Sequence, residues 1–145
     1  MSETCVSRIV KETSQVIWEV LLSKGFIESP KFKKDWRKIA NDFETLWNFP
    51  NCVGAIDGKH VRIQCPKGTG PLHFNYKKYF SIVLMPVANA RYQFILVDVG
   101  DYGRISDGGI FASSEFGCAI TNDIFDLPKP RKLDGSNKYF PYVFL

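Results

Sequence analysis

The spacing of apolar residues changes from helical to strand-like at residues 48–51 of this chain. Before that point apolar residues recur three or four positions apart in two stretches, Thr4 to Leu22 and Pro30 to Trp47, which predicts two amphipathic helices. We expect Gly25 to end the first. Pro50 ends the second, because proline has no N–H to donate and biases the preceding residue away from helix.

After Pro50 the pattern is typical of strands. Residues 52–64 alternate, and residues 80–88 and 92–99 are short apolar runs, so three strands are predicted. The connection at residues 89–91 has hairpin length, which makes the second and third strands antiparallel neighbours. Ser106 and Asp107 predict a helix that ends at Gly117. A polar loop over residues 121–138 and a fourth strand over residues 139–145 complete an α/β chain.

Composition excludes several classes of protein. The 145 residues suffice for one hydrophobic core. The longest apolar stretches are far shorter than the roughly 20 residues of a membrane-spanning helix, so we expect no membrane span. Four cysteines lie scattered along the chain, and free thiols are the preferred interpretation. The spacing of Cys52, His60, Cys65 and His73 matches no standard zinc site.

The positive charge is concentrated in one part of the chain. The formal net charge is +4, and residues 49–80 hold five basic side chains against Asp57 alone. Such a patch favours a polyanionic partner, although a net charge of this size is also ordinary for a protein that binds no nucleic acid. Within it, Lys77 and Lys78 follow two aromatic residues, a mixture suited to a nucleic-acid backbone or to a solvated loop.

Asp57 and Gly58 allow two interpretations. Asp-Gly between alternating apolar residues is a strong hairpin signal. The alternative is one continuous strand that carries the Asp57 carboxylate, with Gly58 leaving room for a ligand or metal ion. A carboxylate of this kind is a hard ligand for Mg²⁺ or Mn²⁺. Of the later acids, Asp101 is most simply a turn residue and Asp107 a helix-start residue.

Residues 47–61 (WNFPNCVGAIDGKHV) strongly resemble the PIF/Harbinger transposase-derived nucleases, the Harbinger-like DDE endonuclease family. The similarity covers nearly everything after Pro30. It continues through FNYK (74–77), FSIVLM (80–85), YQF (92–94), DVG (98–100), GRISDGGIF (103–111) and YFPYVF (139–144).

The resemblance implies a partial RNase H-like fold with three antiparallel strands, a helix and a fourth strand, preceded by two helices. Residues 49–145 would be the N-terminal part of a DDE nuclease domain. Residues 1–48 resemble the last part of a helix-turn-helix-like region followed by a linker helix. We therefore expect a chain truncated at both ends.

The resemblance also implies a site. Such nucleases use three carboxylates to hold two divalent metal ions, Mg²⁺ or Mn²⁺, for phosphodiester chemistry. Asp57 matches the first aspartate, the family's second aspartate and its glutamate have no counterpart in this chain, and Asp107 is a further candidate ligand. The implied partners are DNA and a Myb-like DNA-binding protein, and the implied location is the nucleus, with the cytoplasm as an alternative.

Two hypotheses for function follow. In the first, the chain is a truncated and catalytically incomplete copy of a metal-dependent DNA nuclease, in which Asp57 is a metal ligand. In the second, the chain is a non-catalytic module that binds DNA or protein. The candidate nucleic-acid contacts are Lys59, His60, Arg62, Lys77 and Lys78.

Overall fold

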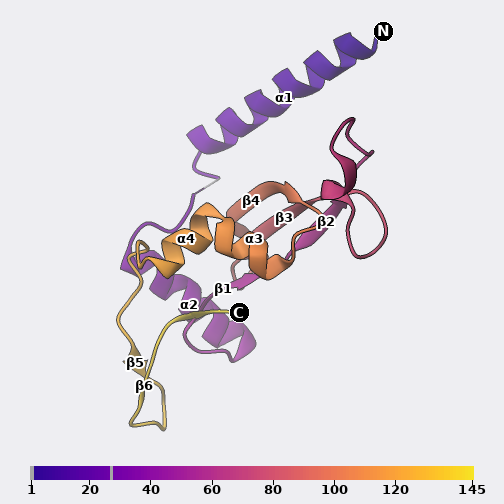
Figure 1. Ribbon diagram of the computed structural model, residues 1–145. Coiled ribbons are helices and arrows are strands. Elements are labelled where there is room, and N and C mark those ends of the chain that lie inside the picture. Colours follow the sequence, from indigo (N-terminus) through magenta and orange to yellow (C-terminus); the bar gives the residue numbers. More distant parts are fainter. Residues whose placement is uncertain (1, 27) are drawn as a thin grey trace.

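Two helices begin the chain, as the apolar spacing predicted: α1 (Glu3–Ser23) and α2 (Lys33–Trp47). The computed structural model describes residues 2–26 and 28–145, and Figure 1 shows α1 projecting away from the remaining elements. Gly25, with a left-handed φ of 69°, follows the end of α1, which confirms the predicted stop. No residue of α1 is buried. None of the described helices is long and apolar enough to span a membrane.

α2 begins at Lys33, three residues after Pro30, and Asp35 sets this start. The Asp35 Oδ2 atom accepts hydrogen bonds from the backbone N–H groups of Phe32 (3.0 Å) and Lys31 (3.1 Å). Both bonds stabilise the ionised carboxylate and lower the pKa of Asp35. They also hold Lys31 and Phe32, the two residues before the helix, outside it.

The sheet is built around β3 (Ser81–Ala88), which pairs antiparallel with β4 (Phe94–Tyr102) on one side. On its other side lie β1 (Cys52–Ile56) and β2 (Lys59–Arg62), also antiparallel to β3. β3 and β4 form the predicted hairpin, in which Asn89 Oδ1 accepts from the N–H groups of Arg91 (2.9 Å) and Gln93 (3.0 Å). The prediction of three neighbouring antiparallel strands is confirmed.

β4 runs to Tyr102, beyond the predicted end at Val99. A bulge between the pairs Val83–Asp101 and Leu84–Val99 accommodates Gly100, whose φ of 119° suits glycine. The interpretation of Asp101 as a turn residue is therefore wrong, because the bulge lets the strand continue through it.

The predicted helix over residues 106–117 is two helices, α3 (Asp107–Ser113) and α4 (Glu115–Thr121). Asp107 is the first residue of α3, as predicted, and Ser106 Oγ accepts from Gly109 N–H. Ser114 has extended backbone angles and caps α4 by accepting from Gly117 N–H at 3.0 Å. The prediction that Gly117 ends the helix is wrong, since this glycine lies inside α4.

The predicted loop and fourth strand contain three short strands: β5 (Arg131–Lys132), β6 (Tyr139–Phe140) and β7 (Val143–Phe144). β5 pairs with β6 in a small hairpin, which the loop prediction missed. Pro141 lies between β6 and β7, so the predicted strand over residues 139–145 is interrupted. β7 lies parallel to β1, and Asn51 Nδ2 donates to Phe140 O at 3.0 Å.

Two groups of helices cover this sheet. Ile110 of α3 and Phe116 of α4 pack against the buried residues of β3, which are Val83, Met85 and Val87. α2 packs along β1 through its own buried residues Trp36, Ala40 and Phe43. The result is a mixed α/β fold with four α-helices in the described residues and a mixed sheet.

Candidate nucleic-acid and metal site

Asp57 and Gly58 interrupt a strand without turning it. Ile56 pairs with Val87 and Lys59 pairs with Leu84, so β1 and β2 share one register along β3. In this register the two interrupting residues stand opposite Pro86 and Met85. The hairpin interpretation of Asp57 is therefore wrong, and the continuous-strand alternative is correct. Asp57 itself is exposed.

The carboxylate of Asp107 lies directly against Gly58. A Cβ atom on Gly58 would collide with Oδ1 and Cγ of Asp107 and lie 3.0 Å from its Oδ2. Only a glycine leaves this space, so the sequence feature that suggested room for a ligand in fact makes room for a second carboxylate. The structure thus brings Asp107, from the start of α3, to the residue next to Asp57.

Three of the predicted basic residues gather beside this point, on the α3 side of the sheet. The guanidinium of Arg62 lies 4.5 Å from the centre of the Tyr79 ring, and Lys77 Nζ lies 5.3 Å from that of Tyr76. The His60 ring makes an edge contact with Tyr76, with 5.5 Å between the ring centres. Hydrogen bonding to Tyr76, with smaller effects from the charges of Tyr76, Tyr79 and Asp107, raises the pKa of Lys77.

The other two predicted basic residues lie apart. Lys59 precedes His60 in β2, and successive residues of a strand point to opposite faces, so Lys59 lies on the other face of the sheet. Lys78 is exposed in a turn, with a left-handed φ of 64°. The structure therefore unites His60, Arg62 and Lys77 but not all five candidates.

Sequence reasoning missed the buried polar residues behind His60. Ser81 Oγ lies 2.9 Å from His60 Nδ1 and accepts from Asn75 Nδ2 at 2.9 Å. The signal was present, since Ser81 occupies an inward position of β3 whose other inward residues are apolar. A serine there needs polar partners.

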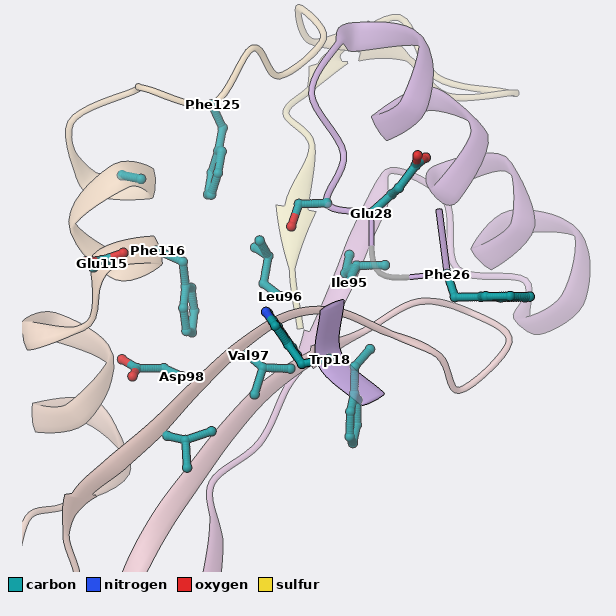
Figure 2. Close-up of a pocket in the computed structure, with 14 residues that line it drawn as sticks. Trp18, Phe26, Glu28, Ile95, Leu96, Val97, Asp98, Glu115, Phe116 and Phe125 are labelled. Atoms are coloured by element: carbon teal, nitrogen blue, oxygen red, sulfur yellow. The ribbon is translucent and has the colours of Figure 1, made fainter. Parts of the chain in front are cut away.

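A separate hollow of about 720 Å³ lies between α1, β4 and α4. Its labelled lining residues in Figure 2 include Trp18 of α1, Val97 of β4, Phe116 of α4 and Phe125. Its lining includes the acids Glu28, Asp98 and Glu115 and no lysine or arginine. This hollow therefore suits a polyanion poorly, and the candidate site remains at Asp57. Within residues 2–26 and 28–145, no three His, Cys, Asp or Glu side chains gather in a way that could hold a metal ion.

Comparison with known proteins identifies the family. The family model described as DDE superfamily endonuclease matches residues 56–134, more than half of the chain. The chain belongs to the DDE superfamily endonucleases. The match begins one residue before Asp57 and includes Asp107, and it confirms the resemblance to the Harbinger-like DDE endonucleases.

Two curated relatives are similar to this DDE superfamily endonuclease chain. "Putative nuclease HARBI1" of Rattus norvegicus is 23% identical over 145 residues, which cover all of this chain and 40% of the relative. "Protein ALP1-like" of Arabidopsis thaliana is 26% identical over 107 residues, 71% of this chain and 26% of the relative. The chain thus spans 40% or less of the length of these relatives. No solved structure matches the chain.

Proposed function

We propose that this chain carries part of the nuclease core of a transposase-derived, divalent-metal-dependent DNA endonuclease. The observation that carries the proposal is the Asp107 carboxylate lying against Gly58, next to the exposed Asp57. It brings an acid from α3 against the backbone position that follows Asp57, although 50 positions separate the two acids in the sequence. Clustered acids are what metal-dependent cleavage of a phosphodiester needs.

We further propose that the sheet is part of an RNase H-like core. Three antiparallel strands are followed by helices and then by β7, which adds parallel to the first strand. The spatial order is β4, β3, the β1–β2 strand and then β7. In such an arrangement Asp57 lies on a central strand.

Asp57 and Asp107 fit a magnesium or manganese ion in chemical type. Both are carboxylates, and both are exposed to solvent. Mg²⁺ is commonly held by one or two protein carboxylates together with oxygens of the substrate phosphate. A bound ion would polarise the phosphodiester and lower the pKa of an attacking water. With two candidate acids, we propose that this chain alone binds the ion weakly and does not cleave DNA.

The basic residues on the Asp107 side of the sheet support DNA as the substrate. His60, Arg62 and Lys77 lie on the same side of the sheet as Asp107, and the latter two stack on exposed or half-exposed tyrosines. Cations bind phosphates, and aromatic faces stack on bases. The family's endonuclease description is consistent with this substrate.

The test is metal binding and DNA cleavage by the purified chain. We expect Mn²⁺ binding, measured by electron paramagnetic resonance, to weaken about tenfold or more in both Asp57→Asn and Asp107→Asn. Asp134→Asn, an exposed acid in the β5–β6 turn, is the matched control and should bind as the unmodified chain does. Equal binding by all three variants would refute the assignment of the ligands. Mn²⁺-dependent cleavage that is lost in Asp57→Asn would refute the proposed inactivity of the isolated chain.

A second function is favoured by the stacked cations alone: a non-catalytic module that binds DNA without metal. Its signature is an affinity that falls with salt, with a logarithmic slope of about −2 if both cations contact phosphates. Binding that ignores salt would count against it. A Myb-like partner and a nuclear location, with the cytoplasm as an alternative, are further proposals, to be tested by co-purification and by imaging of the tagged chain.

A further inference from the structure

His60 is backed by a short chain of buried polar side chains. Its Nδ1 atom lies 2.9 Å from Ser81 Oγ, and Asn75 Nδ2 lies 2.9 Å from the same oxygen. Ser81 is 0% exposed and Asn75 is 3% exposed. Buried polar atoms rely on protein partners, because unpaired ones are costly.

The atoms themselves fix the direction of these hydrogen bonds. Asn75 Oδ1 accepts from the backbone N–H of Tyr79 at 3.2 Å, which orients the amide and makes Nδ2 the donor to Ser81. In the described part of the chain, Ser81 Oγ has one other partner, His60 Nδ1. Among the described residues, Nδ1 is the one hydrogen-bond partner of Ser81 Oγ that could accept the hydroxyl proton, so we take this proton to point at Nδ1. Nδ1 is then unprotonated, and the ring proton sits on Nε2.

Gly103 packs closely against Ser81. A Cβ atom at Gly103 would overlap Ser81 Oγ and would lie 2.7 Å from the carbonyl oxygens of Ser81 and His73. The backbone of Gly103 also donates to Ser81 O at 3.1 Å. The serine is thus enclosed by backbone, and no side chain at position 103 offers its hydroxyl a competing acceptor.

The outer edge of His60 is free to meet a ligand. Across residues 2–26 and 28–145, its Nε2 atom has no hydrogen bond, and it is not among the buried unpartnered atoms. Tyr76 and Tyr79 contact the ring edge-on, with ring centres 5.5 and 6.5 Å away. Lys77 and Arg62 stack on those tyrosines. An N–H donor flanked by two cations suits an anionic oxygen.

We infer that Ser81 and Asn75 are positioning residues that hold His60 as its neutral Nε2–H tautomer, aimed at a phosphate oxygen of bound DNA. The identity of the ligand rests on the proposed function. The tautomer does not, because it follows from the buried hydrogen bonds alone.

The tautomer is tested on the chain without ligand by two-bond ¹H–¹⁵N correlation of ¹⁵N-histidine-labelled protein. The chain has two histidines, so His73→Gln assigns the signals of His60. We expect the pattern of a ring protonated on Nε2, and a mixture of tautomers in Ser81→Ala. A ring protonated on Nδ1 in the unmodified chain would overturn the inference.

The phosphate contact is tested with a fluorescent DNA duplex and two substitutions. The amide nitrogen of glutamine reaches the place of Nε2, whereas that of asparagine reaches the place of Nδ1. We expect His60→Gln to keep DNA affinity within about threefold and His60→Asn to lose about tenfold, with thermal melting checking that both fold. Equal losses would overturn the contact. An unmodified chain without DNA affinity would overturn the proposed function and the phosphate contact, while the tautomer experiment would still decide the positioning role.

Discussion

The first two helices carry similar apolar stripes but lie in different surroundings. α2 buries Trp36, Ala40 and Phe43 against the sheet, whereas α1 buries no residue. Val10 and Ile17 of α1 remain 58% and 54% exposed. Helical spacing therefore predicts that a helix forms, while burial depends on what the rest of the fold places beside it. The stability of this chain should depend on α2 and very little on α1.

The largest effect should come from Trp36→Ala. Trp36 is 0% exposed and packs against Phe125 and Phe144, with ring centres 5.4 and 5.8 Å away. We expect the free energy of unfolding to fall by about 3–5 kcal/mol in urea denaturation followed by circular dichroism. Trp18→Ala in α1, where the side chain is 54% exposed, should cost less than about 1 kcal/mol. Equal losses would mean that α1 is packed as firmly as α2.

Gly58→Ala should have the next largest effect, because it disrupts the packing of α3 on the sheet. The new Cβ would collide with the Asp107 carboxylate. We expect a loss of about 1–3 kcal/mol in the same denaturation experiment. Gly108→Ala is the control, since its Cβ would meet nothing within 4 Å in an exposed helical position. It should be neutral or stabilising by up to about 1 kcal/mol, and a loss as large as that of Gly58→Ala would contradict the contact.

Asp35→Asn should make a smaller, pH-dependent difference at the start of α2. The pKa of Asp35 is lowered by the hydrogen bonds from Phe32 and Lys31, so the ionised form stabilises the folded state. This contribution is complete above about pH 4, the ordinary value for aspartate, and is lost as the pH falls through the lowered pKa. Thermal melting of both proteins should differ at pH 7 and converge in acid. A constant difference across this range would contradict the assignment.

The smallest effect on global stability should come from Ser2→Ala in α1. Ser2 Oγ caps the helix by accepting from Cys5 N–H at 3.3 Å. Because α1 is unburied, fraying of this helix should lower the circular dichroism signal. The free energy of unfolding of the remaining elements should stay unchanged within about 0.3 kcal/mol. A loss of free energy of unfolding as large as that of Gly58→Ala would show that α1 and the sheet unfold together.

Periodicity predicted the elements that have a strong repeat, namely both long helices and the strands around β3. It failed where a single residue overrides the repeat. Ser114 divides the expected helix by capping α4, Gly100 lets β4 continue through a bulge, and Pro141 divides the last predicted strand. Caps and bulges depend on local hydrogen bonds that a pattern of apolar residues does not contain.

The candidate site was predictable from sequence only where it depends on local features of the chain. Asp57 could be placed on a strand from the resemblance, and Asp107 at a helix start from its neighbour Ser106. That Gly58 receives the Asp107 carboxylate depends on how α3 packs on the sheet, which involves residues far apart in the sequence. The hydrogen bonds that orient His60 likewise join separate segments of the chain.

β1 and β2 share one register along β3, but their backbone amides should differ in protection from hydrogen exchange. β1 lies between β3 and β7 and under α2, whereas β2 pairs with β3 alone within the part of the chain that the structure describes. Amides of β2 should therefore exchange with solvent deuterium through local opening, while those of β1 should exchange only through cooperative unfolding. Asp57 and Gly58 stand at the boundary between these slow and fast halves. Under the proposed function, this boundary would let the backbone adjust around a bound phosphodiester while the buried core stays closed.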